Sequence, residues 1–456
     1  MSTRVDSPLA MFVDRIQADD AHAAHHAGLL RRAELALTDP ASFSETDRAG
    51  LALRLERWRY QWLVEHAGRL TADDRRLIDA LDLASNRLAG RPERPPRAVR
   101  AAVEGDAPRA SKLLDDARQW LDPAVRLDEL TLRAARATAE YFGDVAPNDR
   151  DSLAGRRMLL YAPLYLSSFC INQCTYCGFR FDQPIERRHL SVDEAMAEAE
   201  ILRRRGFRHV LLVAGDFPRL ASTEYFVEII ARLRAMELCP AIEIAPQSTS
   251  SYAAMVEAGL SGVTLYQETY QETLYGTYHP GGTKASFDWR LEGPERAAEA
   301  GARRLGLGVL LGLADPVEDV LAMTRHAAYL RERFPHVRLA FSLPRIHEAP
   351  DGFRTPYTID DDTFVRLYCL LRLAFPDANL VLSTRERPAL RERLAKICIT
   401  QLSAGSSTAP GGYGHEPTDG QFPVHDHRGV DEVVAWLRTE GFRPVWDFDG
   451  FEGPAA

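Results

Sequence analysis

Cysteine is scarce in this chain, and a long apolar run is missing. Six cysteines in 456 residues are too few for the disulfide framework of a small secreted domain. No stretch approaches the roughly 20 consecutive apolar residues of a membrane-spanning helix, and the first residues lack the apolar segment of a signal peptide. We therefore expect a cytoplasmic protein with no membrane partner.

An excess of positive charge is also missing. The 56 Lys and Arg residues against 65 Asp and Glu leave a net charge of -9, which argues against nucleic acid as a partner. Hydrophobic residues make up 45% and charged residues 27% of the chain, as in ordinary globular proteins. The length suffices for a large domain with an appendage, so composition favours an intracellular enzyme with a small-molecule substrate.

Three of the few cysteines lie close together. Cys170, Cys174 and Cys177 have C-x3-C-x2-C spacing and follow an apolar run, residues 158–166, that is typical of a strand end. Clustered thiolates suit a soft metal centre. A 4Fe-4S cluster normally takes one thiolate on each iron, so three thiolates leave one iron open for a small-molecule ligand. The spacing therefore favours one 4Fe-4S cluster.

Two other interpretations of these cysteines are possible. A zinc site usually pairs C-x2-C with a second pair further along the chain, and no second pair follows here. Disulfides would need an oxidising compartment, for which the composition gives no sign. The remaining cysteines, Cys239, Cys369 and Cys398, stand in apolar surroundings, and we expect them to be buried core thiols.

The pattern of the chain changes along its length. Residues 1 to about 90 have helical spacing, and the Pro- and Arg-rich segment 90–97 interrupts it. Further on, short apolar strands alternate with amphipathic helices, which predicts a parallel sheet and, with eight units, a (β/α)8 TIM barrel of the α/β class. We expect an N-terminal helical region over 1–120 and the barrel over 121–450. The expected strands are 159–166, 210–214, 241–245, 262–267, 305–312, 339–343, 379–383 and 398–402.

Several short segments make a family resemblance specific. The cysteine spacing resembles that of the radical S-adenosylmethionine (SAM) superfamily. Segments spread over roughly 120–450 resemble its aromatic amino-acid lyase branch, which includes tyrosine and tryptophan lyases. Among these segments are Cys177-Gly-Phe-Arg180, Tyr266-Gln-Glu-Thr-Tyr270, Leu382-Ser-Thr-Arg-Glu386, Ser403-Ala-Gly-Ser406 and Gly420-Gln-Phe422.

The resemblance implies a reaction. The open iron would bind SAM, and an electron from the cluster would cleave SAM to a 5′-deoxyadenosyl radical. That radical would abstract a hydrogen atom from an amino-acid substrate, and cleavage or rearrangement of a carbon–carbon bond would follow. A low-potential flavodoxin or ferredoxin is the implied reductant.

The resemblance also implies roles for single residues. Phe179 would flank the adenine of SAM, and Arg290 would engage its polar groups. Gly215 and Asp216 stand where the family has a Gly-Glu pair near the SAM amino group. The acids that end two strands, Glu243 and Glu268, would reach the SAM ribose or the substrate; they could instead be solvated loop residues or helix N-caps. The expected substrate-pocket residues are Tyr165, Arg345, Ser403 and Tyr413, although tyrosines at such positions are also common packing residues.

Two departures from the family matter. No cysteine follows Cys398, so we expect no second, C-terminal cluster. Ser407 stands where the family usually has a basic residue that holds the substrate carboxylate. Another cation must then hold it, because a buried carboxylate without a partner is costly. Arg345 and Arg385 are the candidates, and we favour Arg345 because it ends the sixth expected strand.

Two other functions remain open from the sequence. The chain could be a radical SAM tailoring enzyme of specialised metabolism that acts on a different substrate, which Ser407 and the N-terminal region favour. It could also be a non-catalytic helical interaction protein with a relict barrel, although the intact cysteine triplet argues against that.

Overall fold

A computed structural model describes residues 8–9, 12, 21–66, 71–91, 98–105, 117–122, 124–144, 153–414 and 418–452. The chain divides into two compact units. One contains Met1–Ala98 and Gly281–Ser286, and the other contains Val99–Pro280 and Phe287–Ala456. The division thus falls at Ala98, whereas the sequence suggests a boundary near residue 120. Within the described ranges no helix is long and apolar enough to cross a bilayer.

The N-terminal unit is helical, as the sequence predicts. Its elements are α2 (Ala21–Thr38), η1 (Pro40–Ser42), α3 (Glu45–Glu65), α4 (Ala72–Leu88) and η2 (Thr283–Ala285). Ser44 and Thr71 begin α3 and α4 with capping boxes, in which the hydroxyl accepts from a backbone N–H one turn later. Trp58 of α3 is buried in the core of this unit, and Trp62 donates a 3.0 Å hydrogen bond to Asp74. These two aromatic residues of α3 therefore contribute to packing of the N-terminal unit.

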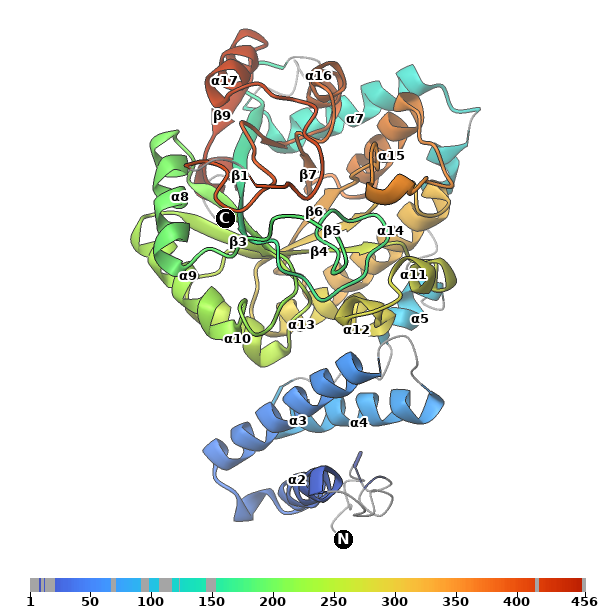
Figure 1. The fold of residues 1–456 in the computed structure, drawn as a ribbon. Coiled ribbons are helices and arrows are strands. Elements are labelled where there is room, and N and C mark those ends of the chain that lie inside the picture. Colours follow the sequence, from blue (N-terminus) through green and yellow to red (C-terminus); the bar gives the residue numbers. More distant parts are fainter. Residues whose placement is uncertain are drawn as a thin grey trace. The chain divides into compact units, whose positions relative to one another are not determined.

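The second unit contains the predicted barrel (Figure 1). Its strands are β1 (Arg157–Ser167), β2 (His209–Ala214), β3 (Cys239–Glu243), β4 (Gly262–Glu268), β5 (Arg304–Val309), β6 (Arg338–Ser342), β7 (Asn379–Leu382), β8 (Gln401–Ser403) and β9 (Arg443–Val445). All pairs are parallel, and β1 pairs with both β2 and β8, which closes the barrel. The eight strands that the sequence predicts are thereby confirmed. The last begins at Gln401, because Cys398 is the C-cap of the preceding helix.

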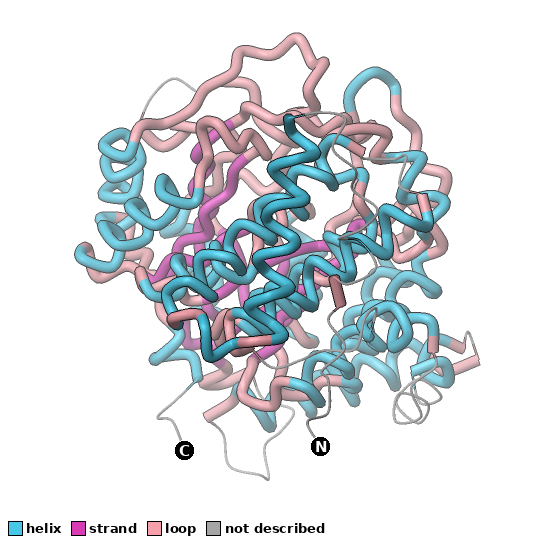
Figure 2. The backbone as a smooth tube through the Cα atoms, turned by 90° about the horizontal axis from the view of Figure 1, so that it is seen from below, coloured by secondary structure: helices cyan, strands magenta, loops and turns pink. Residues whose placement is uncertain are grey.

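Helices precede, connect and follow the strands, and helices are drawn in cyan in Figure 2. They are α5 (Ala98–Glu104), α7 (Leu127–Phe142), α8 (Val192–Arg204), α9 (Thr223–Ala235), α10 (Thr249–Glu257), α11 (Glu272–Tyr278), α12 (Phe287–Leu291), α13 (Gly293–Glu299), α14 (Pro316–Arg333), η3 (Pro350–Gly352), α15 (Asp361–Ala374), α16 (Pro388–Ile397), α17 (Val430–Thr439) and α18 (Phe448–Glu452). Between β1 and α8 the chain forms a long loop, residues 168–191, which we call the cysteine loop because it carries Cys170, Cys174 and Cys177.

The sequence does not predict β9. This short strand pairs in parallel with Arg157–Leu159, the first residues of β1. The carbonyl of Trp446, directly after β9, accepts a 3.0 Å hydrogen bond from the N–H of His209, the first residue of β2. The C-terminal segment therefore joins the starts of β1 and β2. Pro444 hides the strand in the sequence, because proline is confined to edge positions of a sheet.

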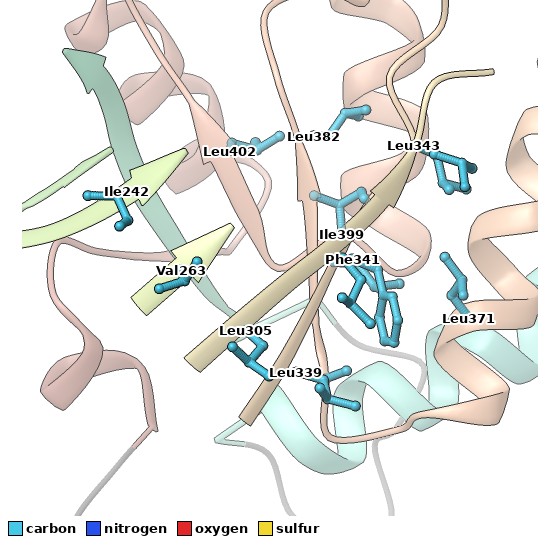
Figure 3. Packing of buried hydrophobic residues seen from close by; sticks show 14 of the residues in the cluster. Ile242, Val263, Leu305, Leu339, Phe341, Leu343, Leu371, Leu382, Ile399 and Leu402 are labelled. Carbon is cyan, nitrogen blue, oxygen red and sulfur yellow. The ribbon is translucent and has the colours of Figure 1, made fainter. Parts of the chain in front are cut away.

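Side chains alternate along the barrel strands. One set points outward and forms the main apolar core with the helices, including Ile242, Val263, Leu305 and Phe341 together with Leu371 of α15 (Figure 3). A cavity of about 50 Å³ inside the barrel is lined by residues of several strands, and the polar ones include Tyr161, Thr264, Tyr266, Ser342 and Gln401. The alternation follows from the two-residue period of a strand, so the outer face is apolar and much of the inner face is polar.

The isolated cysteines lie in different surroundings. Cys369 and Cys398 are fully buried, as expected. Cys239 is only partly buried, because it is the first residue of β3 and lies at the end of the barrel where the strands begin. The expectation of a core thiol is therefore wrong for Cys239.

A buried arginine fixes the start of β1. Arg156 is 2% exposed, and its guanidinium donates to the carbonyls of Ala395, Lys396 and Ile397, at 3.3, 2.7 and 3.2 Å. These carbonyls end α16, where the helix dipole favours a cation. Burial lowers the pKa of Arg156 to about 10, so the side chain remains charged at neutral pH.

Replacing this arginine should destabilise the barrel. We expect Arg156→Met to lower the free energy of unfolding by about 2–3 kcal/mol, because buried carbonyls lose their charged donor. Urea denaturation followed by tryptophan fluorescence measures the change. The matched control is Arg157→Met, which removes an ion pair with the exposed carboxylate of Asp144 and should cost less than about 1 kcal/mol. Equal losses of unfolding free energy in both variants would contradict the stabilising role of Arg156.

Candidate active site

The cysteine loop lies against the ends of the first two strands. Backbone hydrogen bonds join it to other segments: the N–H of Ile171 donates to the carbonyl of Asp216 at 2.8 Å, and the N–H of Gly178 donates to that of Gln421 at 3.3 Å. Cys174 is buried, whereas Cys170 and Cys177 are partly exposed. The loop is thus held between the end of β2 and the segment after β8.

One arginine, for which the sequence contains no motif, organises the cysteine loop from within. The guanidinium of Arg187 donates to the carbonyls of Ser168, Phe179 and Arg180, at 2.5, 3.1 and 2.6 Å. Ser168 begins the loop, whereas Phe179 and Arg180 follow the last cysteine, and all three carbonyls point to one guanidinium. A planar group with five donors can satisfy several acceptors at once, so Arg187 sets the curvature of the chain around the cysteines.

The sulfur atoms of the triplet accept backbone hydrogen bonds. The N–H of Asn172 lies 3.4 Å from Sγ of Cys170, and the N–H of Phe179 lies 3.4 Å from Sγ of Cys177. Burial raises the pKa of Cys170 to about 11, and the nearby carboxylate of Asp216 adds to the shift. The thiolate therefore needs a positive group beside it, which an iron centre supplies.

The donor set fits a 4Fe-4S cluster better than a single ion. Within the described part of the chain, no three Cys, His, Asp or Glu side chains converge on a point that could hold one metal ion. A zinc site requires such convergence. A cluster does not, because each thiolate binds a different iron. Cys170, Cys174 and Cys177 are the residues that would hold the cluster, as the sequence predicts.

Gly215 and Asp216 lie directly under the cysteine loop. The N–H of Gly215 donates to the carbonyl of Ser167 at 2.9 Å, and a Cβ atom at this position would lie 2.3 Å from the carbonyl oxygen of Phe169. The carboxylate of Asp216, which is 9% exposed, accepts a 3.1 Å hydrogen bond from the side chain of Asn172. Only glycine permits this approach, and Asp216 connects β2 to the loop.

A buried ion pair lies at the end of β4. Glu268 has a φ of 72°, in the left-handed region that is costly for residues other than glycine, and a bulge precedes it. Arg290 of α12 lies 3.2 Å from its carboxylate and also donates to the carbonyl of Tyr266 at 2.6 Å. Both side chains are about 10% exposed. The strained backbone thus turns the carboxylate towards Arg290.

Glu243 contributes negative charge to the interior of the barrel. It ends β3 and is partly buried. Burial raises the pKa values of Tyr161, Tyr165 and Tyr266, and the charge of Glu243 adds to each shift. The carboxylate of Glu243 therefore acts on three phenols from β1 and β4, and they remain protonated.

Tyr165 and Phe179 form an aromatic contact at the mouth of the barrel. Their rings meet edge to face, with centroids 6.0 Å apart and planes at 86°, a favourable arrangement. The hydroxyl of Tyr165 donates a 2.8 Å hydrogen bond to Gln421. Ser403 ends β8 and is buried, and its hydroxyl accepts a 3.0 Å hydrogen bond from the N–H of Thr384.

The guanidinium of Arg345 binds carboxylates of the protein itself. Its guanidinium forms a fork with both carboxylate oxygens of Glu386, one at 2.9 Å, and a 3.1 Å bond to Asp361. Burial opposes ionisation of Glu386, but its bonds to Arg345 and His347 outweigh burial and lower the pKa to about 2. The donors of Arg345 have protein acceptors, which is the reason that we prefer Arg385 in the proposal below.

Tyr413 also has a structural position. Its hydroxyl donates to the carbonyl of Pro163 at 2.7 Å and accepts from the N–H of Ser407 at 3.2 Å. The carboxylate of Glu198 on α8 accepts from the N–H groups of Tyr413 and Gly414, both at 2.8 Å. Tyr413 therefore attaches the loop after β8 to β1 and α8, and its expected role in the pocket is not supported by these contacts.

Arg385, the other candidate, faces the interior. Its guanidinium stacks over the ring of Phe422 at 3.6 Å and donates to the carbonyl of Arg345 at 3.4 Å. Burial lowers its pKa, and the nearby Tyr165, Glu268 and Glu243 act in the opposite direction. Its hydrogen bond and its ring contact are with uncharged groups, and the nearest charges acting on it are those of Glu268 and Glu243.

Comparisons with known proteins agree with this site. Residues 164–327 match the model of the radical SAM superfamily, and residues 342–443 match that of the biotin and thiamin synthesis associated domain. The chain is 36% identical over 347 residues to 2-iminoacetate synthase of Escherichia coli, covering 75% of this chain and 89% of that protein. The structure of the FeFe-hydrogenase maturase HydG from Carboxydothermus hydrogenoformans matches with a TM-score of 0.66 and 29% identity, over 89% of this chain and 85% of HydG.

The chain belongs to the radical SAM superfamily, in its aromatic amino-acid lyase branch. It is therefore an enzyme that uses a 4Fe-4S cluster and SAM. A second HydG structure matches with a TM-score of 0.67 and 31% identity, over 77% of this chain and 80% of that chain. The cluster assignment of Cys170, Cys174 and Cys177 is thus consistent with both the geometry and the family.

The contact under the cysteine loop can be tested by adding one methyl group. We expect Gly215→Ala to reduce the bound iron severalfold after anaerobic reconstitution, because the methyl group would displace Phe169 and with it Cys170. Iron and sulfide analysis measures the loss. The matched control is Gly276→Ala in α11, where no atom lies within 4 Å of the added Cβ. Full iron content in Gly215→Ala would show that the close approach is dispensable.

Proposed function

We propose that the enzyme is a carbon–carbon lyase for an aromatic amino acid, with tyrosine as the first candidate. The observation that carries this proposal is that buried Arg385 interacts electrostatically with Glu243 and Tyr165, and that Tyr165 also lies near Cys177 of the cysteine loop. A cation and an anion in one pocket suit the carboxylate and ammonium groups of an amino acid. The similarity to 2-iminoacetate synthase, at 36% identity, supports the same substrate class.

The cluster and SAM, when bound, supply a 5′-deoxyadenosyl radical that abstracts a hydrogen atom. The protein must position the substrate and exclude water from the reaction. We assign the substrate carboxylate to Arg385, because a guanidinium matches the two oxygens of a carboxylate. Its stacking on Phe422 at 3.6 Å holds the guanidinium plane in place. Glu243 is assigned to the ammonium group, and Tyr165 and Ser403 to the pocket wall.

The SAM site is proposed on the other side of the cysteine loop. Gly215 and Asp216 would lie beside the methionine part of SAM, and Phe179 would flank the adenine. The Glu268–Arg290 pair would bind polar groups of SAM, and its two short contacts make the pair rigid before any ligand arrives. A low-potential flavodoxin or ferredoxin is the proposed reductant, and the cytoplasm is the proposed location.

A second function remains a candidate because of Ser407. Its hydroxyl accepts from the N–H of Ala409 at 3.3 Å, within a turn where a Cβ on Gly412 would overlap it. The turn is therefore closed around a small residue, where the family usually has a basic one. A radical SAM tailoring enzyme with a different substrate would account for this change.

Product analysis distinguishes the two functions. We expect reconstituted enzyme with SAM, a low-potential reductant and tyrosine to release p-cresol, or a corresponding indole product from tryptophan. Both products are detected by liquid chromatography with mass spectrometry. Incubation with the other amino acids is the control. Formation of 5′-deoxyadenosine alone with every amino acid would contradict the lyase proposal and favour the tailoring enzyme.

The carboxylate anchor gives a separate prediction. We expect Arg385→Met to lower kcat/KM for the amino acid roughly 100-fold, because a buried carboxylate would lose its partner. SAM cleavage without substrate should continue. The matched control is Arg387→Met, which removes an arginine two residues away whose side chain is 64% exposed. Normal kcat/KM in Arg385→Met would place the anchor elsewhere.

A further inference from the structure

One side chain of the segment after β8 connects the barrel mouth to the cysteine triplet. Gln421 lies between Tyr165 and Cys177: the hydroxyl of Tyr165 is 2.8 Å from Oε1, and Nε2 is 3.8 Å from Sγ of Cys177. The sulfur contact lies at the long end of a hydrogen bond. A deprotonated sulfur is a stronger acceptor than a thiol, which favours the contact once the thiolate forms.

The backbone holds Gln421 at this position. Its N–H donates to the carbonyl of Thr408 at 3.0 Å, and its carbonyl accepts from the N–H of Gly178 at 3.3 Å. A Cβ on Gly178 would lie 2.6 Å from that carbonyl oxygen, so the residue after Cys177 can approach only because it is glycine. The side-chain contact is therefore part of a close docking of two loops.

Chemistry fixes the orientation of the amide. A thiolate can only accept hydrogen bonds, so the NH₂ group of Gln421 must face Cys177 and the carbonyl oxygen must face Tyr165. The phenol hydroxyl must then donate, and burial, which raises its pKa, keeps it protonated. By donating to the amide oxygen, Tyr165 stabilises the orientation in which the NH₂ group faces the sulfur.

We propose that Gln421 raises the reduction potential of the cluster by donating an N–H···S hydrogen bond to Cys177, and that Tyr165 locks the amide in the donating orientation. Hydrogen bonds to cluster sulfurs stabilise the additional negative charge of the reduced state. The other donor to Cys177 described above is the backbone N–H of Phe179. Gln421 is a side-chain donor, and substitution can remove it.

The test is the midpoint potential of the reconstituted cluster, measured without SAM or substrate by a redox titration monitored by electron paramagnetic resonance. In Gln421→Leu we expect about a tenfold smaller ratio of reduced to oxidised cluster at a fixed potential, which is a shift of about 59 mV to lower potential for one electron. Tyr165→Phe should shift the potential in the same direction by less, because the amide can then rotate. The double variant should match Gln421→Leu.

The control is Asp419→Asn in the same loop, whose carboxylate accepts from the N–H of Glu186 and whose change should leave the potential unaltered. An unchanged potential in Gln421→Leu overturns the proposal. If Tyr165→Phe shifts the midpoint potential equally in the wild-type protein and in Gln421→Leu, Tyr165 does not act through Gln421, and its proposed role is overturned. If Gln421→Leu does not retain iron, Tyr165→Phe decides, and an unchanged potential there overturns the proposal.

Discussion

The docking of the cysteine loop onto the end of β2 is the constraint on which the active site depends. The loop contains no regular element between β1 and α8, so its shape comes from contacts made elsewhere. Gly215 admits the carbonyl of Phe169, Gly178 admits that of Gln421, and Arg187 gathers three carbonyls of the loop. A loop held in this way presents three thiolates to a cluster without support from a helix.

Side chains alternate along the barrel strands, so packing and chemistry are assigned to opposite faces of the sheet. Outward side chains build the apolar core with the helices, which stabilises the fold. Inward side chains are free from that task, and they include the buried phenols of Tyr161 and Tyr266, on which the charge of Glu243 acts. The chemistry therefore lies at the ends of strands that are rigid for reasons unrelated to it, as in other barrels of this type.

Two arginines, Arg345 in the loop after β6 and Arg385 in the loop after β7, have different roles. Arg345 and Glu386 form a buried fork that joins the two loops, whereas Arg385, next to Glu386, interacts electrostatically with Tyr165, Glu268 and Glu243. The fork fixes the loop on which Arg385 stands. A structural ion pair thus positions the residue to which we assign the substrate carboxylate.

Local pattern alone determined much of this protein. The cysteine spacing indicated the cluster, and the alternation of strands and helices indicated the barrel, because both depend on residues close together in the chain. The helical N-terminal unit was predictable for the same reason. Strand β9 was not predictable, because its pairing depends on a partner nearly 300 residues away and its sequence contains proline.

Only the tertiary structure shows that Arg345, and not Arg385, forms a fork with a carboxylate. Both end or follow strands, and their neighbours in sequence do not show which guanidinium finds a carboxylate. Gln421 is a similar case, since its contacts with Tyr165 and Cys177 join segments about 250 residues apart. The sequence specifies which groups are available, whereas the closing of the barrel brings distant loops together and so decides which groups meet.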